Sequence, residues 1–251
     1  MFRSAAAGLS LFLAFAVSPV RAADDDPKEI ITKALKAHGG EEYVTKHQAM
    51  RAQNKGKITL PGVGEAEFTQ ELSYMLPNKF RDVLELKVGG QTIKITTLAN
   101  GDDISIDAAG QAVPVDDKIK TSMKDAMAMI GVARLVPLLK DKNYELSLFG
   151  DTKIDDKPAV GVRVSAKGKK DITLFFDKKT NLLVKVEHRA LEAGTGTEVN
   201  EERFVLEYGK GKDGVPQPKK VLVKQDGKTF IEAETVEYTA LEKIDESEFK
   251  K

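Results

Sequence analysis

The sequence predicts a mainly β protein of the α+β class, built around one antiparallel sheet. Apolar and polar residues alternate with a period of two in many short segments, which are separated by turn residues such as glycine and aspartate. Helical spacing of apolar residues occurs in two places, near the N-terminus and in the middle of the chain. The chain of 251 residues has no cysteine, so an apolar core and not disulfide bonds must stabilise the fold.

The first 22 residues predict a cleavable signal peptide. Arg3 supplies a positive charge, residues 5–17 are almost wholly apolar, and Val20 and Ala22 are small residues suited to cleavage after Ala22. This apolar run of about 13 residues is shorter than the roughly 20 that span a bilayer, and the alternative is a short anchor that stays attached. We therefore expect a bacterial periplasmic protein in which residues 23–251 form a single domain, with no transmembrane segment after cleavage.

The charge pattern argues against a nucleic-acid partner. Lysine and arginine number 39, aspartate and glutamate also number 39, and the formal net charge is zero. Because both signs are interspersed along the chain, no basic stripe stands out as a nucleic-acid footprint.

The first predicted helix follows the acidic segment at residues 24–26. Asp26 can cap the helix, Pro27 suits its first turn, Glu29 can complete a capping box, and Gly39-Gly40 ends it. A second short helix is predicted from Glu41 to His47.

Alternating segments then predict half-buried strands with one face toward water. Their apolar positions include Phe68, Leu72, Tyr74, Leu84, Leu86, Ile93 and Ile95. Gly89-Gly90 and Asp226-Gly227 each separate two such segments and predict hairpin turns. After the middle of the chain, further strands are predicted at residues 146–149, 160–165, 172–176, 182–188, 204–208, 221–224 and 230–238.

Between the two sets of strands, residues 116–139 predict a central helix. Ile119, Met123, Met127 and Ile130 recur at helical spacing, and Pro137 is expected to end or kink the helix. Methionine is flexible and polarizable, so this helix face suits an adaptable apolar ligand. The plainer interpretation is that these methionines fill the core.

The sequence offers no residues for catalysis. It has no cysteine nucleophile and no GxSxG motif, and the spacing of its three histidines, His38, His47 and His188, fits no common metal motif. We expect a protein that is not an enzyme and that uses neither a cofactor nor a metal.

Three short motifs resemble the LolA-like lipoprotein-carrier family. They are Pro77-Asn78-Lys79-Phe80-Arg81, the segment from Phe176 to Lys185, and Asp245-Glu246-Ser247-Glu248-Phe249. The resemblance implies a half-open antiparallel β-barrel wrapped around an N-terminal helix and a central helical segment, with a hydrophobic cavity for acyl chains. One position departs from the family, because Leu76 stands where carriers typically have an arginine that helps to hold the cavity lid.

We therefore expect an exported, non-enzymatic carrier or binder of lipid acyl chains or lipidated proteins. The alternative is an envelope adaptor with a filled core, which binds a protein partner through its outer face or a strand edge. The residues expected to line the cavity are Phe68, Leu72, Tyr74, Leu84, Leu86, Ile93, Ile95, Met123, Met127 and Ile130.

Overall fold

The computed structural model describes residues 26–192 and 196–250. The predicted signal peptide lies outside these residues. The helices are α1 (Pro27–Ala37), α2 (Gly40–Lys46), α3 (Asp117–Ala133), α4 (Val136–Lys140) and the short 3-10 helix η1 (Glu246–Phe249).

The described strands alternate with short turns on both sides of the central helices. They are β1 (Ala49–Leu60), β2 (Gly64–Met75), β3 (Lys79–Val88), β4 (Gln91–Asn100), β5 (Asp103–Ala108), β6 (Gln111–Val113), β7 (Tyr144–Ile154), β8 (Lys157–Ala166), β9 (Ile172–Asp177), β10 (Leu183–Leu191), β11 (Glu198–Lys210), β12 (Pro216–Gln225) and β13 (Lys228–Leu241).

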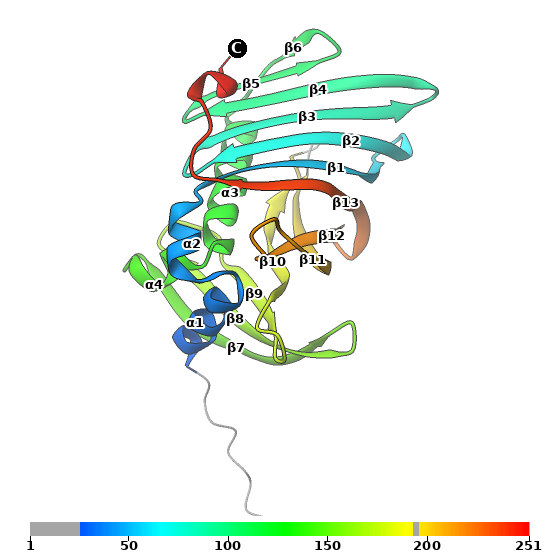
Figure 1. The fold of residues 1–251 in the computed structure, drawn as a ribbon. Coiled ribbons are helices and arrows are strands. Elements are labelled where there is room, and N and C mark those ends of the chain that lie inside the picture. The colour runs from blue at the N-terminus through cyan, green and yellow to red at the C-terminus, as the bar shows by residue number, and fades with distance from the viewer. Residues whose placement is uncertain (1–25, 193–195, 251) are drawn as a thin grey trace, which may run out of the picture.

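All thirteen described strands belong to one sheet that does not close into a barrel. Its order is β6-β5-β4-β3-β2-β1-β13-β12-β11-β10-β9-β8-β7, and every neighbouring pair is antiparallel. The sheet curls from β6 at the top of Figure 1 to β7 at the bottom, around α3 (Figure 1). The predicted mainly β fold with a half-open antiparallel sheet is confirmed.

The predicted turns join consecutive strands. Gly89 and Gly90, both at positive φ, connect β3 to β4, and Asp226 and Gly227, also at positive φ, connect β12 to β13. Strand β1 was not predicted, because the inward positions in its middle, Asn54 and Gly56, are polar or lack a side chain and so weaken the alternation.

The predicted central helix is divided in two. α3 stops at Ala133, Leu135 takes a positive φ of 67°, and α4 then begins at Val136. Pro137 neither ends nor kinks the first helix. It sits in the first turn of α4, where a missing N–H costs nothing and the fixed φ of proline favours a helix. The prediction for Pro137 was wrong.

The largest core lies between the helices and the strands at the β7 end of the sheet. Ile31 and Ala34 of α1 are fully buried, and so are Val162 of β8 and Leu174 of β9. Val132 of α3 joins the same core. α1 is well placed by its cap, since the Asp26 side chain accepts a hydrogen bond from the Lys28 amide at 3.0 Å. Among the described residues, no helix is both long enough and apolar enough to span a membrane.

Candidate functional site

The candidate site is the concave face of the sheet, on which α3 packs. The Asp116 side chain caps α3 by accepting a hydrogen bond from the Ile119 amide at 2.9 Å. Met127 of this helix packs against Met50 of β1 and Tyr74 of β2. α3 therefore lies on the inner side of the strands, behind β1 to β3 in Figure 1.

The seven strand residues predicted to line a cavity share this concave face. Phe68 pairs with Leu86, which pairs with Ile93, and Leu84 pairs with Ile95 in the adjacent row. Leu72 and Tyr74 have the same parity as Phe68, and Tyr74 contacts α3. All seven therefore lie on one surface, but the structure divides them between two clusters.

The α3 cluster lies where the helix meets the sheet. Its buried members are Met50, Ala52, Tyr74 and Met127, with Leu72, Leu76, Phe80, Ile130 and Tyr238 packed against them. Four of the predicted residues are found here. Met123 is half-buried on α3 and belongs to none of the core clusters of the described residues.

The distal cluster lies further along the same strands. Its buried members are Ile58, Ala66, Phe68 and Leu86, and the half-buried members are Leu60, Leu84, Val88, Ile93, Ile95, Phe230, Ile231 and Ala233. All of them come from strands, so no residue of a described helix belongs to this cluster. The half-buried state of Leu84, Ile93 and Ile95 leaves apolar surface open on the concave face.

A polar row separates the two clusters. Asn54 Nδ2 donates to Gln70 Oε1 at 2.9 Å, and Gln70 Nε2 donates to Asp82 Oδ2 at 3.1 Å. Asp82 Oδ1 is buried and has no hydrogen-bond partner among the described residues. Burial raises the pKa of Asp82 to about 6, although the Gln70 hydrogen bond and the nearby Arg81 charge act in the opposite direction.

The raised pKa of Asp82 predicts a stability that depends on pH. The unfolded carboxyl ionises near pH 3.9, so the cost of the buried charge develops between pH 4 and pH 6 and is fully present above pH 6. We expect Asp82→Asn to raise the free energy of unfolding by roughly 2 kcal/mol at pH 8 and to change it little at pH 4. Urea unfolding at both pH values measures this difference.

Glu85→Gln is the control for this substitution, because Glu85 is exposed on the opposite face of the same strand, β3. An Asp82→Asn variant that is no more stable than the parent protein at pH 8 would contradict a buried carboxylate in the polar row.

Arg134, at the C-terminal end of α3, links this helix to α2 by hydrogen bonds. It caps the C-terminal end of α3, and its Nη2 donates to Val44 O at 2.9 Å and to His47 O, both at the end of α2. Leu76, at the position where carriers typically have an arginine, packs into the α3 cluster instead. An arginine from α3 thus ties two helices together by binding orphan carbonyls of α2.

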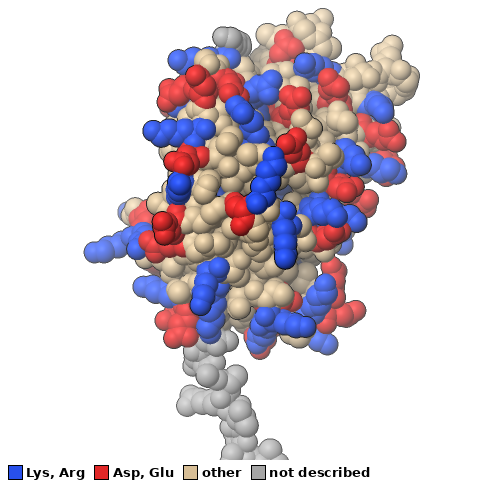
Figure 2. Space-filling view, viewed as in Figure 1, with Lys and Arg blue, Asp and Glu red and all other residues tan. Residues whose placement is uncertain are grey.

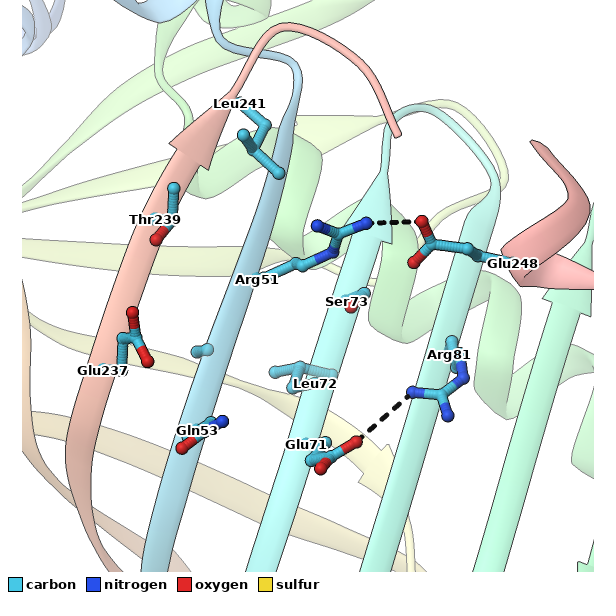
Figure 3. A pocket seen from close by; sticks show the side chains of 11 residues that line it. Arg51, Gln53, Glu71, Leu72, Ser73, Arg81, Glu237, Thr239, Leu241 and Glu248 are labelled. Atoms are coloured by element: carbon cyan, nitrogen blue, oxygen red, sulfur yellow. Dashed lines mark hydrogen bonds and ion pairs between the residues drawn. The ribbon is translucent and has the colours of Figure 1, made fainter. Parts of the chain in front are cut away.

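A hollow of about 500 Å³ lies on the opposite, outer face of the sheet (Figure 3). Arg51 pairs with Glu248 of η1, and Arg81 Nη1 lies 3.7 Å from Glu71 Oε2. Both arginines are therefore matched by carboxylates of the chain itself. η1 is held against this face by Arg51 and by Phe249, which is 2% exposed in a small apolar cluster.

A second hollow, of about 310 Å³, opens between α3 and the strands near the β7 end of the sheet. Val132, Val164 and Ile172 contribute apolar surface, and lysines occupy its rim. None of the ten predicted residues lines it. Sequence reasoning missed it because it followed one face of α3, whereas Ala128 and Val132 lie on another.

The three histidines lie in separate surroundings. Burial lowers the pKa of His38, whose Nδ1 lies 2.8 Å from Ala34 O. His47 Nδ1 lies 2.9 Å from Tyr43 O, and His188 Nε2 lies 3.6 Å from a Glu201 oxygen. In the part of the chain that the structure describes, no group of three or more histidine, aspartate or glutamate side chains is arranged to hold a metal ion.

Basic and acidic side chains are interspersed over the face seen in Figure 2, so this face has no broad patch of one sign (Figure 2).

An open antiparallel sheet wound partly around helices is a half-barrel, and several solved structures have a fold similar to that of this chain. A DUF1329 family protein from Desulfovibrio piger gives a TM-score of 0.53 at 14% identity, over 90% of this chain and 98% of that one. A LolA superfamily protein from Nitrosomonas europaea gives 0.52 at 10% identity, over 90% and 97%.

A putative outer membrane lipoprotein-sorting protein domain from Vibrio parahaemolyticus gives a TM-score of 0.50 at 9% identity, over 89% of this chain and 95% of that one. No protein-family model matches the chain, and no curated protein matches it. The protein has a LolA-like fold.

Proposed function

We propose that the protein is an exported, non-enzymatic carrier or binder of acyl chains, which belong to lipids or to lipidated proteins of the bacterial cell envelope. The distal cluster is the observation that supports this proposal most directly. Its half-buried Leu84, Ile93 and Ile95 are apolar, lie on the concave face and belong to a cluster that includes no residue of a described helix. Covering such a surface with an apolar ligand is favourable, because it removes apolar area from water.

The fold supports the same proposal. The similar structures include a putative lipoprotein-sorting domain and a LolA superfamily protein, and this chain covers nearly the whole of each. The predicted signal peptide at residues 1–22 adds the expectation of export, with the periplasm as the compartment and residues 23–251 as a single domain. The proposed lining is the predicted set of ten residues, with Met127 and Tyr74 serving chiefly as the closed wall.

Binding of a fluorescent fatty acid to the purified mature protein, residues 23–251, tests the site. We expect Ile93→Glu to weaken binding at least tenfold, because a charge would be placed in the distal cluster. Thr92→Glu is the matched control, since Thr92 is the preceding residue of β4 and is exposed on the opposite face. Equal affinities of the two variants would remove the distal cluster from the site.

Native mass spectrometry of the protein from an envelope fraction gives an independent readout. A bound phospholipid or acylated peptide near one-to-one stoichiometry is the expected result. A ligand-free mass together with no uptake of the fatty acid would reject the carrier function.

The adaptor is the second candidate, and one observation favours it. β7 ends the sheet, and its Phe149 is 49% exposed, although it packs edge-on against Phe175 with ring centroids 5.4 Å apart. A protein partner could add a strand at this edge and cover that ring. Phe149→Ser would then reduce partner binding and leave fatty-acid binding unchanged.

A further inference from the structure

The hollow between α3 and the strands at the β7 end combines an apolar floor with a basic rim. Val132 of α3 and Val164 and Ile172 of the sheet contribute the apolar floor, and the exposed Lys167, Lys169 and Lys170 form the basic rim. Its volume of about 310 Å³ is at the lower end of the range for small-molecule pockets.

The floor belongs to the main core. Val132 is 2% exposed and Val164 is 3% exposed, and Ile172 and Tyr144 pack against the same cluster. An apolar group in the hollow would therefore rest on well-packed side chains that do not need to move. This part of the site can hold methylene groups but cannot hold a charge.

The rim carries the opposite chemistry. Lys170 and Arg189 share one carboxylate, Glu198, with N–O distances of 2.5 and 3.3 Å. Lys167 and Lys169 take part in none of the ion pairs between described residues. Lys167, Lys169, Lys170 and Arg189 thus face Asp125 and Asp141 of the lining together with Glu198, so four positive charges stand against three negative ones.

Two carboxylates near the hollow, Glu201 and Asp141, are engaged by other groups of the protein, which reduces their repulsion of an anion at the rim. Glu201 lies close to the wall residue His188, but Arg203 Nη2 lies 3.3 Å from its Oε1 and Gln225 Nε2 donates to its Oε2 at 3.2 Å. Asp141, at the rim, accepts a hydrogen bond from the Asn143 amide at 2.9 Å. Glu201 and Asp141 therefore each have a partner within the protein, and Asp125 is the lining carboxylate that an anion at the rim would face.

We propose that this hollow binds a single-chain amphiphile with an anionic head, a carboxylate or a phosphate. The head lies at Lys167 and Lys169, where it stays in contact with water, and the first part of the chain lies on Val132, Val164 and Ile172. This arrangement avoids burying the charge, which would be unfavourable in an apolar floor. The inference rests on the proposed function, because it assumes that the ligand is an acyl chain, and it adds the chemistry of the head group.

Displacement of a fluorescent fatty acid from the mature protein at low salt tests the head group. The competitors are dodecanoate, dodecyl phosphate, dodecanol and inorganic phosphate. In the double variant Lys167→Glu/Lys169→Glu, we expect dodecanoate and dodecyl phosphate to bind at least tenfold more weakly and dodecanol to bind within twofold of the parent protein. The matched control is Lys94→Glu/Lys228→Glu, which makes the same charge change at exposed sites away from the hollow.

A second variant tests the floor. Ala128→Leu places a larger apolar side chain in the hollow and keeps a strong helix former in α3, so the fold is retained. We expect it to weaken binding of dodecanoate and dodecyl phosphate at least fivefold. Unchanged binding in this variant would overturn the proposal.

The remaining outcomes separate this inference from the proposed function. Failure of the parent protein to bind any of the acyl compounds would reject both. Acyl binding in which the rim variant weakens dodecanol and dodecanoate equally would reject the head-group site and leave the proposed function standing. If inorganic phosphate displaces the fatty acid as effectively as dodecyl phosphate does, the hollow is a site for free anions. That result would overturn the proposal that an amphiphile binds there.

Discussion

Gly56→Ala is expected to lower the free energy of unfolding by about 3 kcal/mol or more, because the added methyl group would meet backbone. A Cβ atom at this position would lie 1.9 Å from Glu232 O and 3.0 Å from Ala233 Cα. Both atoms belong to β13, which pairs with β1 at this point. Neither is the end of a flexible side chain, so the two strands themselves would have to separate.

Gly131→Ala is the matched control for this substitution. Gly131 lies in α3, and apart from the neighbouring backbone of that helix a Cβ atom there would meet no heavy atom of the described residues within 4 Å. Because alanine favours a helix over glycine, we expect the control to raise the free energy of unfolding by about 0.5–1 kcal/mol. Urea unfolding followed by circular dichroism measures both, and a Gly56→Ala variant as stable as the parent protein would contradict the close approach of β13 to β1.

Met127→Glu is expected to have the second large effect, a loss of about 3 kcal/mol of stability at pH 8. Met127 is 6% exposed and is the α3 residue buried in the α3 cluster. Burial would raise the pKa of the introduced carboxyl above that in the unfolded chain. The loss should therefore be largest at pH 8 and should decrease toward pH 4, close to the pKa of about 4.3 that a glutamate has in the unfolded chain.

The same variant tests whether α3 takes part in ligand binding. We expect weaker binding of a fluorescent fatty acid, since α3 would be less firmly seated on the concave face. Thr121→Glu places a carboxylate at an exposed position of the same helix and should leave both stability and binding near the values of the parent protein. Unchanged fatty-acid binding by a stable Met127→Glu protein would remove α3 from the site.

Sequence periodicity was sufficient to place the predicted strand residues on one and the same face of the sheet. Alternation around Phe68, Leu84 and Ile93 selects one side of each strand, and hairpin turns at fixed positions keep neighbouring strands in register. That is why the predicted strand residues all lie on the concave face.

What periodicity could not supply is which part of this face a helix covers. Tyr74 and Leu86 occupy similar alternating positions of their strands, yet Tyr74 packs against Met127 of α3 and Leu86 lies in the distal cluster. The sequence did not reveal the polar row, because Asn54, Gln70 and Asp82 each only break the alternation of apolar and polar residues in their own strand. Their relation depends on strand register across three strands, which no local pattern contains.

The pairing of β1 with β13 joins two strands that are far apart in the sequence, and this affects how the chain folds. Read from β7 to β13 and then from β1 to β6, the sheet is a simple meander, in which the single non-consecutive contact joins the beginning and the end of the described strands. Contacts between distant parts of a chain form slowly, because a large loop must close before they contribute free energy. The strands from β1 to β6 and those from β7 to β12 can each assemble from local hairpins. The two groups become one sheet only when β13, the last strand to be synthesised, is available. Until then the edges of β1 and β12 that will pair with β13 are both open, and open strand edges are the places where an incompletely folded chain aggregates.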